Sequence, residues 1–363
     1  MRFFSNTRVA ALLLALLAAG PAWSAPTQNA PQSAQAQIAL LLPQSGRMAK
    51  AAEAIRDGFL AAYYQDSGKA ADSPSLRFYD SDSQDIVTLL ARVKADGATL
   101  AIGPLDRERL DKLVKAGPLP LPVLALNSVE GYADNLYQFA LAPEDEILRL
   151  VQWLDQQKIR QPLILSAADE GSQRLQKLFQ AAWQASHDNV PKVVTLDPAR
   201  KGGIVADIRD ITRQDKRQDA LFLAAPALAR QVQPALTYFH SSLPLYSLSS
   251  AWDPTADASG QKDLDGLRFC DLPWMLEAAR PEQDALYQSF TRPVSGYDRL
   301  QAFGADAWTL VKSWSALADG EPLSLRSGRV QAGPNRHLRR TPTCAEVRNG
   351  TALVVWSPDG SSR

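Results

Sequence analysis

The chain of 363 residues is poor in histidine and cysteine and carries no net charge. It has 3 His, 2 Cys, and 39 basic residues against 39 acidic ones. His187, His240 and His337 lie far apart and lack the spacing of zinc ligands, so we expect no metal site. A nucleic-acid-binding protein needs a clustered basic excess, which a balanced chain does not supply. We therefore expect no cofactor, no metal and no nucleic-acid partner.

The motifs of common enzymes are also missing. The sequence contains no G-x-S-x-G elbow, no G-x-G-x-x-G after a strand, no P-loop and no H-E-x-x-H. Asp80, Asp82 and Asp85 are spaced like the start of a calcium loop, but the glycine and the terminal glutamate of such a loop are absent. We interpret this segment as a polar loop in which Asp85 or Ser83 caps a helix. No catalytic residue is predicted, and we expect a protein that is not an enzyme.

Only one long apolar run is present, and it lies near the start of the chain. Residues 9–19 follow Arg2 and Arg8 and precede small residues that end at Ser24, which is the pattern of a cleavable signal peptide. We expect a signal peptide over 1–24, a flexible leader over 25–37 and export to the periplasm. The run is too short for a permanent transmembrane anchor. No Cys precedes residue 270, so the lipid-modified Cys of a bacterial lipoprotein is not expected.

The two cysteines, Cys270 and Cys344, allow a single pairing. In an oxidising compartment an even number of cysteines predicts a disulfide. Two buried free thiols are the alternative.

Strand and helix signals alternate from residue 38 onward. The apolar run 38–42 shows no polar alternation, as expected of a parallel strand that is covered on both faces. Helical patterns over 49–65, 86–95 and 107–116 separate it from strand patterns over 76–80, 99–102 and 122–126. The same alternation continues over 145–248, and further helices are predicted over 282–290 and 298–318. This order predicts parallel sheets with right-handed crossovers.

We therefore expect an α/β protein with two doubly wound lobes. The expected boundaries are 38–141 plus 268–320 for the first lobe and 142–267 plus 321–357 for the second. The helix over 298–318 is expected to pack on the first lobe.

A ligand site in an open α/β sheet lies beyond the carboxyl ends of its strands. The turn after the first strand would place backbone N–H groups at a helix N-terminus, where an anion can bind. The candidate cleft residues are listed in chain order: Ser45, Gly46, Asp80, Gly103, Asn127 and Ser128.

The segment 321–350 is rich in arginine. It contains six Arg residues and His337 against Glu321 and Glu346. Such a segment suits an acidic protein surface or the anionic groups of peptidoglycan or lipid, and a solvated hairpin face is the alternative. The candidate partner contacts are Arg336, Arg339 and Arg340.

From residue 38 to about 356 the chain resembles type I periplasmic binding proteins. A narrower resemblance lies in particular phrases, including IALLLPQSGRMAKAAEAIRDGF, AIGPLDRERLDKL, PVLALNSVE, NLYQFALAPEDE, DLDGLRFCDLPWML and RLQAFGADAW. These are similar to the C-terminal domain of the LpoA-type (LppC) penicillin-binding protein activators. The last two phrases are the most specific.

The resemblance implies a non-catalytic regulator of peptidoglycan synthesis that binds a class A penicillin-binding protein. Members of that family are lipoproteins and usually carry a helical-repeat N-terminal domain, in place of which this sequence has the leader 25–37. The fold alone implies an alternative, which is a periplasmic solute-binding protein that delivers a small polar ligand to a transporter.

Overall fold

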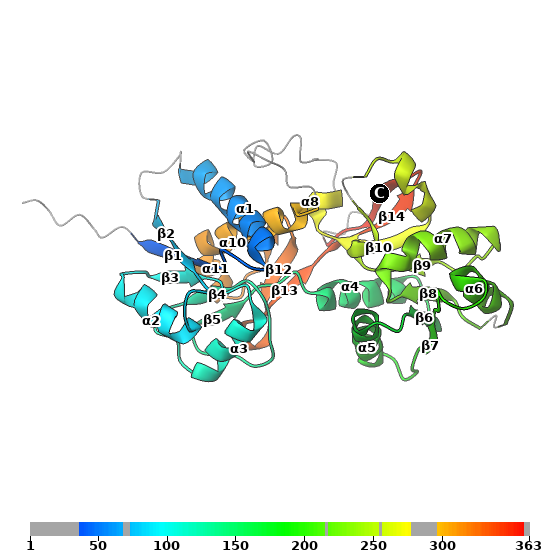
Figure 1. Cartoon of the computed structure of the whole chain (residues 1–363), viewed down its shortest axis with the longest axis horizontal. Helices are drawn as coiled ribbons and strands as arrows, with labels where there is room; N and C mark the ends of the chain where they lie inside the picture. Colours follow the sequence, from blue (N-terminus) through cyan, green and yellow to red (C-terminus); the bar gives the residue numbers. More distant parts are fainter. Residues whose placement is uncertain (1–35, 68–72, 215–216, 254–255, 277–295, 359–363) are drawn as a thin grey trace, which may run out of the picture. The chain divides into compact units, whose positions relative to one another are not determined.

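The computed structural model describes residues 36–67, 73–214, 217–253, 256–276 and 296–358 (Figure 1). The expected signal peptide, most of the leader and the helix expected over 282–290 lie outside the described residues. The leader was expected to end at residue 37, but Gln37 is already the first residue of a strand. Among the described residues, no helix has the length and apolarity needed to cross a membrane.

The first sheet is parallel, as the sequence predicts. It consists of β1 (Gln37–Leu42), β2 (Ser75–Asp80), β3 (Leu100–Ile102), β4 (Val123–Ala125) and β5 (Leu136–Gln138), in the order β2-β1-β3-β4-β5. The helices α1 (Ala49–Ser67), α2 (Ile86–Ala95) and α3 (Arg107–Ala116) connect the strands. Asp85 caps α2, because its carboxylate accepts from the N–H groups of Val87 and Thr88.

Both faces of this sheet are buried, which explains the unbroken apolar run of β1. Leu40 packs in one core with Phe59 of α1 and Phe303 of α10 (Asp298–Lys312). Leu41 packs in a second core with the helices α2 and α3. Since successive side chains of a strand point to opposite faces, each face of the sheet requires its own apolar residues.

The predicted packing of the helix over 298–318 on this lobe is confirmed, although the helix breaks at Ser313 into α10 and α11 (Trp314–Ala318). The helices α1 and α10 lie across each other (Figure 1). A Cβ on Gly58 would lie 1.9 Å from the backbone oxygen of Gln301, and one on Gly304 would lie 1.9 Å from that of Ile55. The two helices therefore approach backbone to backbone.

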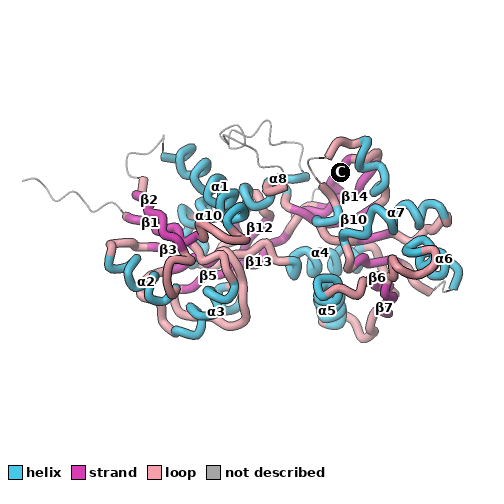
Figure 2. Tube along the Cα trace, viewed as in Figure 1, coloured by secondary structure: helices cyan, strands magenta, loops and turns pink. Residues whose placement is uncertain are grey.

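The second sheet has seven strands. They are β6 (Pro162–Ser166), β7 (Lys192–Thr195), β8 (Ala220–Leu223), β9 (Leu245–Tyr246), β10 (Leu267–Asp271), β14 (Thr343–Arg348) and β15 (Thr351–Trp356). Their order is β15-β14-β10-β9-β8-β6-β7, with β14 and β15 antiparallel to their neighbours and the rest parallel. The accompanying helices are α4 (Pro143–Gln156), α5 (Glu170–Gln184), α6 (Gly203–Gln214), α7 (Ala229–Tyr238) and α8 (Pro273–Leu276). Figure 2 shows the alternation of helix and strand along the chain.

Cys270 and Cys344 form a disulfide, as predicted from their number. They are direct partners in the antiparallel pair β10–β14, and their Cα atoms are 3.9 Å apart. Both side chains are buried in the core beneath the second sheet.

A third, antiparallel sheet corrects the expected lobe boundaries. It contains β11 (Leu323–Leu325), β12 (Gly328–Ala332) and β13 (Leu338–Thr341). Val330 and Leu338 join the core of the first sheet, although 321–357 was expected in the second lobe. Conversely, β10 pairs within the second sheet, although 268–320 was expected in the first. The chain changes sheets at Pro342, between β13 and β14, because only the residues after it pair with β10.

Candidate functional site

The predicted cleft residues lie at the carboxyl edge of the first sheet. Asp80 accepts the N–H of Gln44 at 3.3 Å, which joins the end of β2 to the loop after β1. Asn127 donates its amide to the backbone oxygen of Leu105 at 2.8 Å, which joins the loops after β4 and β3. The structure therefore brings these residues together in two neighbouring pairs of loops.

Most of the polar groups at this edge are bonded to the chain itself. The Asn127 side-chain oxygen accepts the N–H of Ser128 at 2.9 Å, so both ends of this amide are engaged. Asp80 also accepts the N–H of Asp82 at 3.0 Å. Gly103 is buried with φ +102, and a Cβ there would lie 2.1 Å from the backbone oxygen of Leu41. A glycine is thus required at position 103 by the close approach of the backbone, whether or not this edge of the sheet binds a ligand.

Ser45 and Gly46 are exposed in the loop that leads into α1. Gly46 has φ +75, and its backbone oxygen accepts the N–H of Ala49, which begins the helix. Asp80 brings a negative charge to the same pair of loops, which opposes the binding of an anion there.

Gln138 and His337 complete the same edge and were not predicted. Gln138 is 1% exposed, accepts the N–H of Val129 at 2.8 Å and lies 2.8 Å from a ring nitrogen of His337. Its amide also donates to the backbone oxygen of Gly131 at 3.0 Å. The tail beyond β12 is in this way fixed to β5 and to the loop after β4.

The prediction that Arg340 contacts a partner is wrong, because its side chain is buried. Its side chain is 1% exposed, and it donates to the backbone oxygens of Ala140 at 2.9 Å and Ser327 at 3.1 Å. The Asp145 carboxylate lies 3.5 Å from its Nε. Burial raises the pKa of Asp145, and the charge of Arg340 opposes that rise. In strand β13 alternate residues face opposite sides, and the side that carries Leu338 and Arg340 is buried, so only Arg339 is exposed.

A second group of buried charges joins β10, α10 and α4. Arg299 donates to both carboxylate oxygens of Asp271, at 2.6–3.0 Å, and Asp271 is fully buried. The same guanidinium reaches the backbone oxygen of Ser249 at 3.2 Å. Glu146 accepts from the N–H of Ser249 at 2.9 Å and from its hydroxyl at 3.0 Å. Burial, and then the nearby charge of Asp271, raises the pKa of Glu146 to about 7.

Asp306 fixes the third sheet to α10. It is fully buried and accepts the backbone N–H groups of Arg326 at 3.0 Å and Ser327 at 2.6 Å. Burial raises the pKa of Asp306 to about 6. The carboxylates of the buried residues each meet an arginine or a backbone N–H, so these contacts fasten segments of the chain to each other; the residues are Asp145, Glu146, Asp271 and Asp306.

The third sheet presents a basic outer face. In the β12–β13 register Arg329 pairs with Thr341, and Gln331 pairs with Arg339, while Val330 and Arg340 occupy the buried side. The Arg339 side chain is 58% exposed. Arg336 is also exposed, and its Cζ lies 5.5 Å from the ring centroid of Tyr137. We call Arg329, Arg336 and Arg339 the basic face.

Comparison with known proteins identifies the family. The profile of the family described as "LppC putative lipoprotein" matches residues 25–350. The chain belongs to this family. Its likeness to "Penicillin-binding protein activator LpoA" of Pectobacterium parmentieri is 27% identity over 338 residues, which cover 81% of this chain and 50% of that protein. The chain spans about half the length of the curated relatives it matches.

Solved structures of two kinds are similar to this LppC-family chain. The C-domain of LpoA from Haemophilus influenzae, described as "a regulator of PBP1A", is 25% identical with a TM-score of 0.73, covering 88% of this chain and all of that domain. A protein of Chromobacterium violaceum described as a "putative branched-chain amino acid ABC transporter" is 28% identical with a TM-score of 0.70, covering 86% of this chain and all of that one. The resemblance to LppC activators and to periplasmic binding proteins is thereby confirmed.

Sequence reasoning missed the charged contacts that this LppC-family chain buries. Asp271 is the last residue of the buried strand β10, and an acidic residue at that place signals a paired charge, although its partner Arg299 is distant in sequence. Glu146 gave no such signal, because it lies on an amphipathic helix, where acidic residues are usually exposed. Asp306 stands in the apolar sequence AFGADAW, and residues 301–308 of α10 are all buried, so this context is the signal that could have found it.

Proposed function

We propose that this chain is a non-catalytic regulator of peptidoglycan synthesis that binds a class A penicillin-binding protein in the periplasm. The observation that carries the proposal is the match along the whole C-domain of LpoA, which is described as a regulator of PBP1A. The engaged amide of Asn127 and the negative charge of Asp80 agree with it, because they leave the predicted ligand corner poorly suited to an anionic solute.

The basic face is the contact surface in this proposal. Arg339 lies on the exposed side of the third sheet, whose other side is buried, and Arg336 is exposed in the turn between β12 and β13. Exposed charges at the rim of an interface act mainly on the association rate, and their effect weakens as salt rises. Arg340 is excluded from this surface because it is buried.

The first prediction tests this surface with a charge reversal. The double variant Arg336→Glu and Arg339→Glu should associate with a purified class A penicillin-binding protein at least tenfold more slowly at low salt, with a weaker salt dependence. Biolayer interferometry over a range of salt concentrations measures both quantities. The control is Arg107→Glu with Lys177→Glu, which makes the same change in net charge at exposed residues of α3 and α5.

Equal association rates for the two double variants would exclude the basic face. Absence of any binding by the parent chain, together with no effect on peptidoglycan polymerisation by the synthase, would exclude the regulator itself. N-terminal sequencing of the exported protein would test the proposed cleavage after Ser24.

The second candidate is a solute-binding protein for a small polar ligand, and the match to the Chromobacterium violaceum protein favours it. The exposed loop at Ser45 and Gly46 would then contribute to binding. In that case a polar solute should raise the melting temperature, and Ser45→Trp with Ser128→Trp should abolish the rise. A ligand of this kind, combined with no affinity for a synthase, would replace the first proposal.

A further inference from the structure

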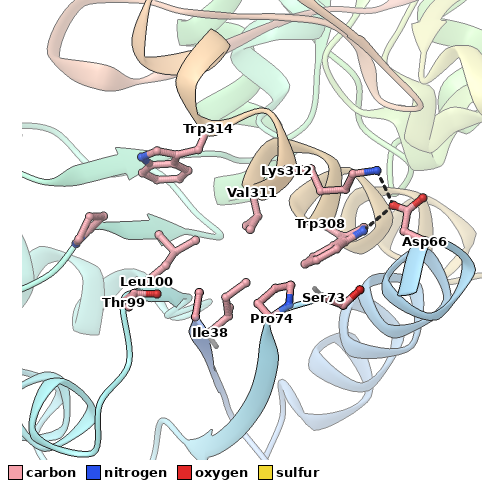
Figure 3. A pocket seen from close by; sticks show the side chains of 12 residues that line it. Ile38, Asp66, Ser73, Pro74, Thr99, Leu100, Trp308, Val311, Lys312 and Trp314 are labelled. Carbon is pink, nitrogen blue, oxygen red and sulfur yellow. Dashed lines mark hydrogen bonds and ion pairs between the residues drawn. The ribbon is translucent and has the colours of Figure 1, made fainter. Parts of the chain in front are cut away.

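A cavity of about 720 Å³ opens at the amino edge of the first sheet, at the opposite end of the strands from the predicted ligand corner (Figure 3). It is lined where β1 to β4 begin, by Ile38, Pro74, Leu100 and Pro122. Ligand sites of open α/β sheets lie at the carboxyl edge, so this cavity is separate from the site that the fold predicts. Its volume lies within the roughly 300–1,000 Å³ of small-molecule pockets.

The remaining wall comes from the end of α10 and the start of α11. Trp308 and Val311 lie on α10, and Trp314 is the first residue of α11, after the helix break at Ser313. Figure 3 shows Val311 and the two indole rings around the space, with Ile38, Leu100 and Pro74 facing them. Two indole rings and aliphatic side chains from different elements therefore face one space.

Trp308 is held rigidly in this wall. Its indole N–H donates to Asp66 at 2.8 Å, and the same carboxylate oxygen accepts from Lys312 at 2.8 Å. The rings of Phe59 and Tyr63 meet Trp308 edge to face, with centroids 5.6 and 5.1 Å away. A wall fixed in this way loses no further conformational entropy on binding.

Polar atoms along the wall are already bonded within the chain. The Thr99 hydroxyl donates to the backbone oxygen of Gln37 at 3.1 Å. The backbone oxygen of Pro74 accepts the Tyr63 hydroxyl at 2.9 Å, and that of Pro122 accepts the N–H of Ala101 at 3.0 Å. Asp66 and Lys312 neutralise each other at the rim. A charged or strongly polar ligand would lose its hydration here without gaining partners in return.

We propose that this cavity is a binding site for a neutral, apolar small molecule that contains an aromatic ring. Apolar walls favour the burial of hydrocarbon surface, and the partly exposed indole ring of Trp314 favours a flat ring by stacking or edge contacts, while Trp308, which is 3% exposed, forms part of the fixed wall. The site does not depend on the proposed regulation of a synthase, because it uses neither the basic face nor the carboxyl edge.

The second prediction uses N-phenyl-1-naphthylamine, a neutral aromatic probe whose fluorescence rises in apolar surroundings. Titration of the purified chain should give a saturable rise. Val311→Trp fills the cavity and should weaken binding at least tenfold. The matched control is Val205→Trp on α6, where the side chain is 49% exposed, and it should change the affinity less than twofold. Trp314→Ala removes one ring and should weaken binding even if Val311→Trp fails to fold.

Circular dichroism confirms that the variants compared are folded. A parent chain without a saturable signal overturns the proposal, and so does equal binding by the Val311→Trp and Val205→Trp variants, which would indicate adsorption to the surface. Displacement of the probe by naphthalene but not by decanol supports the ring specificity, whereas displacement by decanol alone overturns it. Binding to a penicillin-binding protein, measured in parallel, tests the other proposal separately.

Discussion

At the scale of single residues, burial of charge decides which side chains act inside the molecule and which are available to a partner. Arg299 and Asp271 make a bidentate pair with full burial of the carboxylate, and such a pair is costly to break because one charge would be left alone. Arg339 and Arg340 are neighbours in sequence with opposite exposures. The sequence could predict a basic segment, but the face that each arginine occupies depends on strand pairing with β12.

The third prediction concerns the pH dependence of stability at Glu146. Its pKa is raised to about 7 in the folded state from about 4.5, with Asp271, Arg299 and Arg340 as the charges around it. Between these pH values the folded state holds a proton that the unfolded state has released. The contribution of Glu146 to stability is therefore greatest below pH 4.5 and is lost as the pH rises through 7. The loss from this group is at most about 3 kcal/mol.

Glu146→Gln should remove this contribution while keeping both contacts to Ser249. The variant should equal the parent near pH 4.5 and exceed it in the free energy of unfolding near pH 8. Urea unfolding at several pH values measures this difference, and Glu144→Gln on the same helix is the control. Parallel pH profiles for the parent and Glu146→Gln would contradict the assignment.

At the scale of elements, local pattern predicts what lies within a lobe. The apolar run of β1 and the spacing of helices correctly predict the parallel first sheet, because both faces of a parallel strand must be apolar. The three-stranded sheet was not predicted. Its strands are three to five residues long. They pack on the first core because Val330 and Leu338 contact residues that are far away in sequence.

The fourth prediction concerns the crossing of α1 and α10. In a helix, Gly→Ala normally stabilises by up to about 1 kcal/mol, because alanine loses less backbone entropy. At Gly58 and Gly304 the new Cβ would lie 1.9 Å from a backbone oxygen, so the helices would have to separate. Each substitution should therefore lower the free energy of unfolding by about 2 kcal/mol or more.

Chemical denaturation followed by tryptophan fluorescence measures this loss. Gly171→Ala in the first turn of α5 is the control, because its Cβ would approach only the side chain of Asp169, at 3.2 Å. If all three variants were equally stable, the two helices would not be as close as described.

At the scale of the whole molecule, two lobes are predicted correctly in kind, and the segments that join them are not. The order of strands and helices along the chain does not show that the residues after 321 pack on the first core before the chain enters the second sheet. The residues expected at the ligand corner lie at the carboxyl edge of the first sheet, because strand order fixes that edge. The hydrogen bonds that Asn127 donates to Leu105 and that Gln138 accepts from Val129 could not be predicted, because only the fold brings these partners together.

The disulfide joins the two strands, β10 and β14, at which the chain leaves the second sheet and re-enters it. The cysteines are 74 residues apart, and the loop that they close contains α10, α11 and the whole third sheet, which leave the second sheet at β10 and come back at β14. A cross-link that closes a loop of this length limits the unfolded chain and stabilises the fold by about 2–4 kcal/mol.

The fifth prediction follows from this closure. Cys270→Ala with Cys344→Ala should lower the free energy of unfolding by about 2–4 kcal/mol in guanidinium denaturation, and the parent treated with a reductant should show a similar loss. Thiol labelling of the unfolded, unreduced parent should detect no free cysteine. Two labelled thiols would show that the bond is absent, and an unchanged midpoint in the double variant would show that closing the loop adds nothing to stability. Because both strands remain paired through their backbones, the variant should still fold.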